Sequence, residues 1–277
     1  MYQIINGKEV ANHIKQQIKE EIENNNLEIT LAVILVGDDP ASKVYVNNKQ
    51  KACEEVGIKS LTYKLPENIS ENDLLTTIDS LNELDDVDGI LVQLPLPNHI
   101  NENTVIHRIA PKKDVDGFSA VNVGKLWQGD YDFVSCTPAG IIELLDYYNI
   151  DIRGKHCVIV GRSNIVGKPM AALMLECDAT VTICHSKTQN ISDITSQADI
   201  LIAAVGKSKF ITSDMVKNDA IVVDVGINRD ENGKLCGDVD FDNVKDKVSY
   251  ITPVPGGCGP MTIAMLMKNT LIAAKKY

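Results

Sequence analysis

Tyr45 and Lys49 lie four residues apart in the segment YVNNK, which follows an apolar run and the turn GDDP. If this segment forms a helix after a strand, the aromatic ring and the amine share one face of it. An aromatic ring can lie against a flat ligand, and an amine can transfer protons. The alternative is structural, with the tyrosine packed in a core and the lysine on a solvated helix face.

Three more polar side chains of the first half could belong to the same site. Gln93 interrupts the apolar run ILVQLPLP, and a buried amide is costly unless it forms hydrogen bonds. Asp114 and Asp116 follow in the loop PKKDVDGF, where an aspartate can also serve by bonding to the backbone of a turn. Taken singly, each has a simpler structural explanation. Together, at the ends of neighbouring elements of a parallel sheet, they resemble a site.

The segment VIVGRSNIVGKP, residues 158–169, has the pattern of a strand, a glycine-containing turn and the start of a helix. Gly161 permits a tight turn, and the N-terminus of the following helix can bind a phosphate. The match to the dinucleotide pattern G-x-G-x-x-G is imperfect, because Ser163 replaces the middle glycine and Gly167 comes one residue late. The alternative is an ordinary strand-to-helix turn. The segment is the first strand-to-helix turn in the second half of the chain, and this position favours nucleotide binding.

The choice of cofactor depends on the next strand, which ends in CHSK. A site for NAD usually has an acidic residue there, whereas this chain has Ser186 and Lys187. Arg162 lies in the phosphate turn, and a guanidinium is a good partner for an additional phosphate group. These residues together predict NADP as the cofactor.

The segment TPVPGGCGPMT, residues 252–262, contains three prolines and three glycines. Such a loop is rigid and poor in side chains, so that it could lie flat against a planar ligand. Pro255, Gly256 and Gly257 are therefore candidate substrate contacts. A simple linker is the alternative, although this loop runs directly into a helix start.

Strands that alternate with helices predict parallel sheets connected by right-handed crossovers. The expected strands are ITLAVILVG, IKSLTYKL, DGILVQLPLP, HCVIVG, ATVTICHS, DILIAAVG and AIVVDVGIN. We therefore expect an α/β fold of two domains with mostly parallel sheets. Residues 1–136 form an N-terminal α/β domain, completed by a last helix at 261–277, and residues 137–260 form a Rossmann-type domain.

Composition restricts the classes of function. The chain of 277 residues is 44% hydrophobic and 23% charged, as in globular proteins that bury a core. Its 27 Lys and Arg against 38 Asp and Glu give a net charge of -11, which argues against nucleic-acid binding. Neither a signal peptide nor a membrane span is expected, because the apolar tract MTIAMLMKNTLIAA is interrupted by Lys268 and Asn269.

The seven cysteines form no CxxC pair and no repeated spacing. Such a scattered, odd-numbered set is typical of reduced thiols in a cytoplasmic protein. We therefore expect neither a disulfide framework nor a metal site.

Six segments, in order, resemble the bifunctional methylenetetrahydrofolate dehydrogenase/cyclohydrolase family: YVNNKQK, VQLPLP, KDVDGF, GRSNIVGKP, CHSKT and PVPGGCGPMT. The resemblance covers essentially the whole chain. One departure is Cys258, where the family usually has valine, and a thiol is close to valine in size and polarity.

The resemblance implies a homodimer of two-domain subunits that acts on tetrahydrofolate derivatives in one-carbon metabolism. A folate-binding cleft lies between the N-terminal domain and the NADP-binding domain. The enzyme oxidises 5,10-methylenetetrahydrofolate to the 5,10-methenyl form with NADP and hydrolyses this to 10-formyltetrahydrofolate.

The resemblance also implies roles for residues. In the catalytic and folate-binding site, Lys49 is the catalytic lysine, Gln93 bonds to it, Tyr45 lies against the folate and Asp116 holds the pterin edge. In the cofactor site, Arg162 and Ser186 hold the NADP phosphate, and the turn and its surroundings are lined by Gly161, Ser163 and Ile227.

Three alternatives remain open from the sequence. The first is a monofunctional dehydrogenase, which the retention of Lys49, Gln93 and Asp116 disfavours. The second is a nucleotide-sensing protein with an inactive folate pocket. The third is another two-domain NADP dehydrogenase of the shikimate type, which leaves YVNNK and VQLPLP unexplained.

Overall fold

A computed structural model of the chain describes residues 2–276. These residues form two compact units. The unit that we call the N-terminal unit comprises Asn12–Cys136 and the chain from Ile263 onward. The C-terminal unit comprises Thr137–Thr262 together with the start of the chain up to Ala11.

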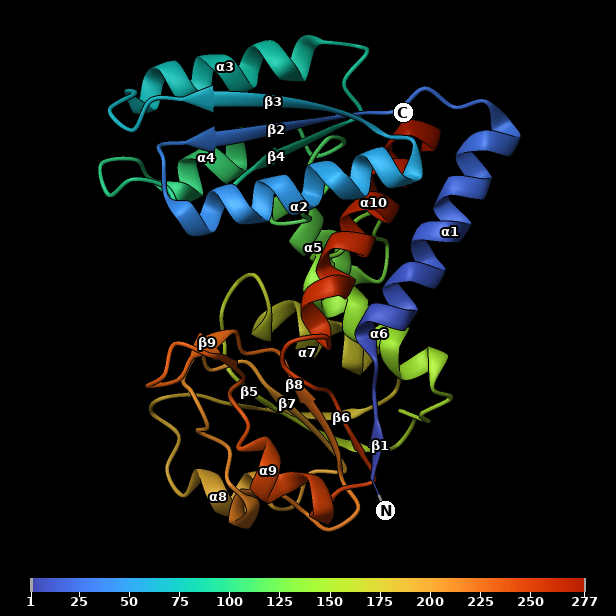
Figure 1. The fold of residues 1–277 in the computed structure, drawn as a ribbon, viewed down its shortest axis with the longest axis vertical. Coiled ribbons are helices and arrows are strands. Elements are labelled where there is room, and N and C mark those ends of the chain that lie inside the picture. Colours follow the sequence, from blue (N-terminus) through green and yellow to red (C-terminus); the bar gives the residue numbers. More distant parts are fainter. Residues whose placement is uncertain (1, 277) are drawn as a thin grey trace. The chain divides into compact units, whose positions relative to one another are not determined.

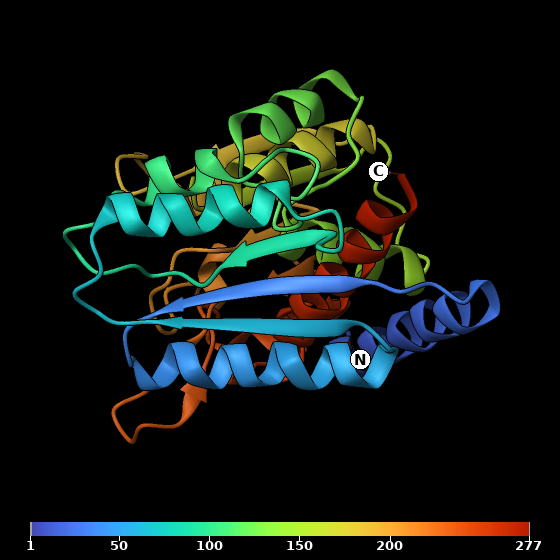
Figure 2. The ribbon, with the colours of Figure 1, turned by 90° about the horizontal axis from the view of Figure 1, so that it is seen from above.

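The N-terminal unit is built on a parallel three-stranded sheet in the order β3-β2-β4. Its strands are β2 (Thr30–Val36), β3 (Lys59–Leu65) and β4 (Gly89–Val92). Every residue of β2 and β4 is buried, which explains why these strands are continuous apolar runs in the sequence. Helices α2 (Pro40–Val56) and α3 (Glu71–Glu83) lie on opposite faces of this sheet (Figures 1 and 2).

Local signals determine where α2 begins and ends. The carboxylate of Asp39 accepts a hydrogen bond from Ser42 N at 2.7 Å, and Pro40 occupies the first turn. Gly57 ends the helix in the left-handed conformation, with φ of 90°. The helix that carries Tyr45 and Lys49 is therefore fixed at both ends, directly after the central strand β2.

The other helices of the N-terminal unit complete its core. They are α4 (Glu102–Arg108), which packs against α3, α5 (Ala120–Gln128), and most of α1 (Gly7–Asn25) and α10 (Cys258–Lys276). The side chain of Asn269 in α10 is only 3% exposed. Its amide donates to Val115 O at 2.8 Å and to Val134 O at 3.0 Å, so the last helix holds the loop that carries Asp116.

The C-terminal unit contains a six-stranded sheet in which every pair of neighbours is parallel. In spatial order its strands are β1 (Gln3–Ile4), β11 (Tyr250–Ile251), β8 (Ile221–Asp224), β7 (Ile200–Ala203), β5 (His156–Val160) and β6 (Thr180–Cys184). This sheet can be followed in Figure 1. The expected α/β fold with mostly parallel sheets is confirmed.

The short helices and strands of this unit connect the large sheet. The helices are α6 (Cys136–Tyr147), α7 (Gly167–Glu176), α8 (Ile191–Thr195) and α9 (Phe241–Val244), with 3₁₀ turns η1 (Ser213–Met215) and η2 (Lys245–Lys247). An antiparallel pair, β9 (Asn228–Arg229) and β10 (Leu235–Cys236), follows β8.

Strand β1 is the point at which the expected domain boundaries differ from the observed units. We expected residues 1–136 in one domain, but β1 pairs with β11 in the sheet of the C-terminal unit. A strand of only two residues has too little periodicity to be assigned from sequence.

The order of the large sheet reverses at β5. The next strand along the chain, β6, lies on one side of β5, and β7 lies on the other. In open α/β sheets ligands bind outside the carboxyl ends of the strands at such a reversal. The turn after β5 and the loop after β7 therefore mark the expected ligand crevice of this unit. Among residues 2–276, no helix is long and apolar enough to cross a membrane.

Candidate active site

Lys49 and Gln93 are joined by a hydrogen bond in the N-terminal unit. Lys49 Nζ donates to Gln93 Oε1 at 3.0 Å, as the family resemblance implies. Gln93 is itself anchored, because its Nε2 donates to Leu94 O at 2.7 Å and its backbone N–H donates to Ile34 O at 2.9 Å. The half-buried glutamine that interrupts an apolar run is thus satisfied, and it orients a half-buried amine.

Asp116 lies within electrostatic reach of Lys49. Burial raises the pKa of the Asp116 carboxyl above its usual value; the charge of Lys49 opposes this and that of Asp114 adds to it. Cys136 Sγ donates to Asp116 Oδ1 at 3.8 Å and to Val115 O at 3.6 Å. Burial and the neighbouring Asp116 charge raise the pKa of Cys136, so its sulfur stays a protonated donor. The structure thus brings Lys49, Gln93 and Asp116 together.

Asp114 has a different environment from Asp116. It is 1% exposed, and its carboxylate accepts from Phe118 N at 3.3 Å, Ser119 N at 2.8 Å and Asn122 Nδ2 at 2.9 Å. Its oxygens are therefore used to build the loop. Asp116 is the aspartate of this loop that offers a carboxylate to a ligand.

Tyr45 is 41% exposed, although α2 buries its neighbours Val46 and Cys53. Core packing therefore does not account for this ring. A rigid aromatic surface one helical turn from Lys49 is suited to contact a flat ligand.

In the C-terminal unit, the turn after β5 depends on two glycines. Gly161 has φ of 141°, and a Cβ atom there would lie 2.2 Å from Ala204 O, at the end of β7. A Cβ atom at Gly167 would lie 2.3 Å from Gly161 O. Glycine at these two positions lets β7, the turn and the start of α7 pack closely.

Ser163 has a role that the sequence did not reveal. Its Oγ accepts from Val166 N at 3.1 Å and from Gly167 N at 3.4 Å, so it holds the turn that leads into α7. The turn has an exposed guanidinium at Arg162, beside a helix N-terminus that suits an anion.

The remaining cofactor candidates follow neighbouring strands. Ser186 comes after β6 and is exposed, and Ile227 comes after β8 and is 51% exposed. Parallel strands end at the same edge of the sheet, so these residues and the Gly161 turn lie at the carboxyl edge, where ligands bind in such sheets. Backbone donors, a guanidinium, a hydroxyl and an apolar side chain fit a phosphorylated dinucleotide.

The loop that follows β11 packs against the start of the chain. Gly256 O accepts from Lys8 N at 3.1 Å, and a Cβ atom at Gly7 would lie 1.9 Å from Gly257 O. The position of buried Gly257 is thus explained by packing, while Pro255 is exposed. Among these three substrate candidates, Pro255 is the one whose side chain is available to a ligand.

Two buried aspartates at this edge were not singled out in the sequence. Asp224, the last residue of β8, is 3% exposed, and Asp238 is 0% exposed. The acidic residue in the apolar run IVVDVG was an available signal, because a buried carboxylate must be paired. Their partners are described below.

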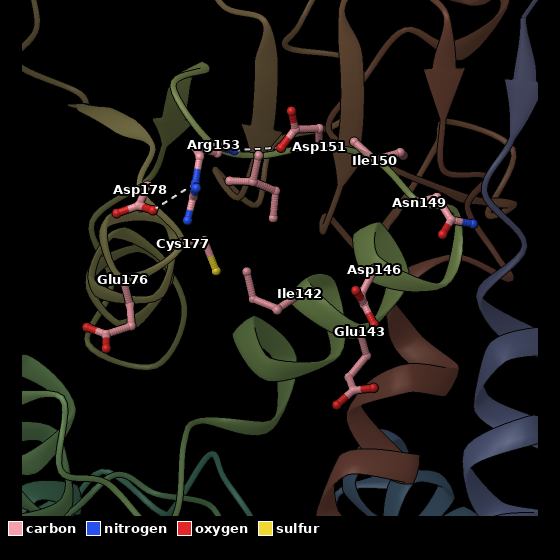
Figure 3. A pocket seen from close by; sticks show the side chains of 11 residues that line it. Ile142, Glu143, Asp146, Asn149, Ile150, Asp151, Arg153, Glu176, Cys177 and Asp178 are labelled. Carbon is pink, nitrogen blue, oxygen red and sulfur yellow. Dashed lines mark hydrogen bonds and ion pairs between the residues drawn. The ribbon is translucent and has the colours of Figure 1, made fainter.

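A separate pocket of about 580 Å³ in the C-terminal unit contains none of the predicted site residues (Figure 3). Acidic side chains line much of it, and Arg153 Nε pairs with Asp178 Oδ2 at 3.1 Å on its wall. Across residues 2–276, no three or more His, Cys, Asp or Glu side chains are grouped to hold a metal ion.

Comparison with known proteins identifies relatives of the whole chain. The family model "Tetrahydrofolate dehydrogenase/cyclohydrolase, catalytic domain" matches residues 5–116, and the "NAD(P)-binding domain" model of the same family matches residues 135–277. The chain is 60% identical to a protein of Lachnoclostridium phytofermentans named "Bifunctional protein FolD", with 100% of this chain and 99% of that one covered.

Solved structures agree with these matches. The bifunctional FolD methylenetetrahydrofolate dehydrogenase/cyclohydrolase of Campylobacter jejuni is 54% identical and superposes with a TM-score of 0.97 over 99% of each chain. The Trypanosoma brucei dehydrogenase-cyclohydrolase, solved with NADP cofactor and an inhibitor, is 37% identical, with a TM-score of 0.94 over 99% of this chain and 98% of that one.

Proposed function

Because the chain belongs to the tetrahydrofolate dehydrogenase/cyclohydrolase family, we propose that it oxidises 5,10-methylenetetrahydrofolate with NADP and hydrolyses the 5,10-methenyl product to 10-formyltetrahydrofolate. The observation that carries this proposal is the bond from Lys49 to Gln93 beside Asp116. This grouping supplies a proton-transferring amine and a ligand-binding carboxylate in one site, in a chain that also contains a dinucleotide turn.

NADP, when bound, accepts a hydride from the one-carbon unit of the folate. The turn after β5 would hold its diphosphate beside the N-terminus of α7, where the helix dipole favours an anion. Arg162 and Ser186 hold the phosphate on its ribose, where a carboxylate would repel it. No acidic residue is present there to repel the phosphate, because β6 ends at Cys184 and is followed by His185 and Ser186.

In the oxidation step, the residues of the N-terminal unit bind and orient the folate. Loss of a hydride requires no base, so alignment of the substrate is what the protein must supply. Tyr45 lies against the flat ring system, and Asp116 accepts hydrogen bonds from N–H groups at the pterin edge. The thiol of Cys136 helps to hold the Asp116 carboxylate in place.

In the hydrolysis step, Lys49 transfers protons. Water attacks the methenyl carbon, and Lys49 accepts a proton from this water at Nζ. The C–N bond to one ring nitrogen then breaks, and that nitrogen gains a proton as the formyl group forms. Gln93 Oε1 fixes the position of Nζ throughout. A cation and water give a neutral formyl group, so the step releases one proton overall.

We further propose that the protein is a homodimer that works in the cytoplasm. The family resemblance supports the dimer. The cysteines of the described residues are free thiols, which suits a reducing compartment. Light scattering on the purified protein tests the dimer: a mass of one chain at working concentration would reject it.

Two assays on the purified protein test the function. NADP reduction with 5,10-methylenetetrahydrofolate reports the oxidation, and 10-formyl product from the methenyl substrate reports the hydrolysis. Activity in both supports the proposal. Reduction without formyl product would leave a monofunctional dehydrogenase, and binding of NADP without either activity would indicate a nucleotide-sensing protein.

A further inference from the structure

A single carboxylate gathers the backbone donors of the loop that follows β7. Val205 N and Gly206 N donate to Asp238 Oδ2 at 2.5 and 2.9 Å, and Lys207 N donates to Asp238 Oδ1 at 2.8 Å. Asn228 Nδ2 adds a fourth bond to Oδ1 at 2.9 Å. Asp238 is 0% exposed, and these four donors satisfy its two buried carboxyl oxygens.

A second carboxylate fixes the segment that carries Asp238. Asp224 Oδ1 accepts from Asp238 N at 2.9 Å and from Gly226 N at 3.0 Å, and its Oδ2 accepts from Val239 N at 2.9 Å. The chain of contacts runs from the end of β8 through Asp224 to Asp238, and from there to the loop at 205–207. The position of this loop therefore depends on Asp224 at the end of the neighbouring strand β8 and on the segment that carries Asp238.

Two glycines make room for these carboxylates. A Cβ atom at Gly237 would lie 1.8 Å from Asp224 Oδ2, and one at Gly226 would lie 2.3 Å from Asp238 Oδ1. Side chains at either position would push the carboxylates away from their donors. The arrangement is thus built into the backbone of the unit.

The loop held by Asp238 forms one side of the expected ligand crevice. It leaves β7, which is the neighbour of β5 at the reversal of strand order. Gly161, at the exit of β5, packs against Ala204 O at the start of this loop. Val205 is 37% exposed, so the loop has an apolar surface at the carboxyl edge. The turn at Gly161 and the loop at 205–207 are the two neighbouring walls of that crevice.

We propose that Asp238 is a positioning residue for the nucleotide cofactor. Its carboxylate holds the loop at 205–207 in the position that suits contact with the bound dinucleotide. The inference rests on the proposed NADP-dependent function. By occupying the N–H groups of Val205, Gly206 and Lys207, Asp238 also removes them as competing phosphate donors. The diphosphate is thereby left to the turn after β5.

The test compares Asp238→Asn with wild type. The amide keeps one acceptor and turns a donor toward N–H groups, so about half of the four bonds fail. We expect the Kd for NADP and the KM for NADP to rise about 10-fold or more. Hydrolysis of 5,10-methenyltetrahydrofolate without nucleotide should stay within about 3-fold of wild type, because Lys49 and Gln93 belong to the other unit.

Asp199→Asn is the matched control. Asp199 precedes β7 at the opposite, amino end of the sheet, where it accepts from His156 N at 2.9 Å and Lys217 Nζ at 2.6 Å. Its replacement should lower thermal stability without changing the Kd for NADP. This separates loss of stability from loss of loop position.

Each outcome decides between the proposals. A wild type that does not bind NADP overturns the proposed function itself. If the wild type binds NADP and Asp238→Asn binds it equally well, only the role of Asp238 is overturned. The same holds if Asp238→Asn loses hydrolysis and NADP binding to an equal extent. If Asp238→Asn does not fold, Asn228→Ala takes its place, because it removes one of the four bonds to Asp238. The Kd for NADP should then rise about 3-fold or more. An unchanged Kd would reject the inference.

Discussion

Lys49 Nζ lies 3.0 Å from Gln93 Oε1, so a side chain of α2 meets a side chain that directly follows β4. Gln93 N is in turn bonded to Ile34 O of β2, the strand that precedes α2. The amine is therefore held by the same sheet that places its helix. This relationship makes the hydrolytic activity of the protein sensitive to single side chains.

Lys49→Met is expected to remove hydrolysis of the methenyl substrate while its KM changes little. General acid–base groups contribute about 10²–10⁴-fold, and the rate should fall within that range. Formation of 10-formyltetrahydrofolate is the measurement. Lys51→Met, an exposed lysine on the same helix, is the control and should behave as wild type. Hydrolysis by Lys49→Met at the wild-type rate would reject the role.

The two aspartates of the loop PKKDVDGF should differ in what their loss changes. Asp116→Ala should weaken folate binding by about 10- to 150-fold, the worth of a charged hydrogen bond, with little change in the melting temperature. Asp114→Ala should lower the melting temperature, because the N–H groups of Phe118 and Ser119 lose their buried acceptor. Folate titrations and thermal melts of both variants check this. If the two variants changed folate affinity and melting temperature to the same extent, the proposed difference between Asp114 and Asp116 would be contradicted.

Arg162→Ala should reduce the preference for NADP over NAD. The guanidinium pairs with the additional phosphate of NADP, and NAD offers no phosphate at that position. The catalytic efficiency with NADP should fall about 10- to 150-fold at fixed ionic strength, while that with NAD stays nearly constant. Arg153→Ala, which removes an exposed arginine paired with Asp178, is the control. An unchanged ratio would indicate that Lys187 or another donor holds this phosphate.

Asp224 should give the free energy of unfolding a particular pH dependence. Burial raises the pKa of Asp224 to about 6, against the N–H donors of Val239, Asp238 and Gly226, which lower it. The folded state thus binds this proton more tightly than the unfolded chain does, for which the pKa is about 3.9. The contribution of Asp224 to stability is fully present below about pH 4 and is lost as pH rises through 6, by about 3 kcal/mol.

Asp224→Asn isolates this contribution. The unfolding free energy of wild type minus that of the variant should fall between about pH 4 and pH 6 and level off above pH 7. Denaturant unfolding at several pH values measures it. A difference that stays constant over this window would show that Asp224 does not titrate there.

The fold and the family were predictable from sequence because their signals are local. Buried strands such as β2 are continuous apolar runs, and six ordered motifs identify the family, which the comparisons confirm. The dehydrogenase/cyclohydrolase function follows from the same motifs. The bond between Lys49 and Gln93 was expected from the resemblance and is present.

What the sequence did not reveal depends on contacts between distant segments. The four donors of Asp238 come from residues 205–207 and from Asn228, and no spacing in the sequence links these positions. Helix α4 has only seven residues, too few for a clear helical period. The hydrogen bonds of Ser163 within its turn were hidden because the residue was compared with a glycine pattern.

The discontinuous make-up of the two units has a consequence for how the protein is synthesised. Gln3 pairs with Tyr250, and the N-terminal unit needs the chain from Ile263 onward. A nascent chain therefore cannot complete the C-terminal unit until the residues up to Thr262 have been synthesised, and the N-terminal unit must wait for the residues that follow, although β2, β3 and β4 are available early. We expect separately expressed fragments 1–136 and 137–277 to be unstable alone and to gain protease resistance when mixed. Between these stages the growing chain exposes unfinished sheet edges, which makes late synthesis the period in which it depends most on chaperones.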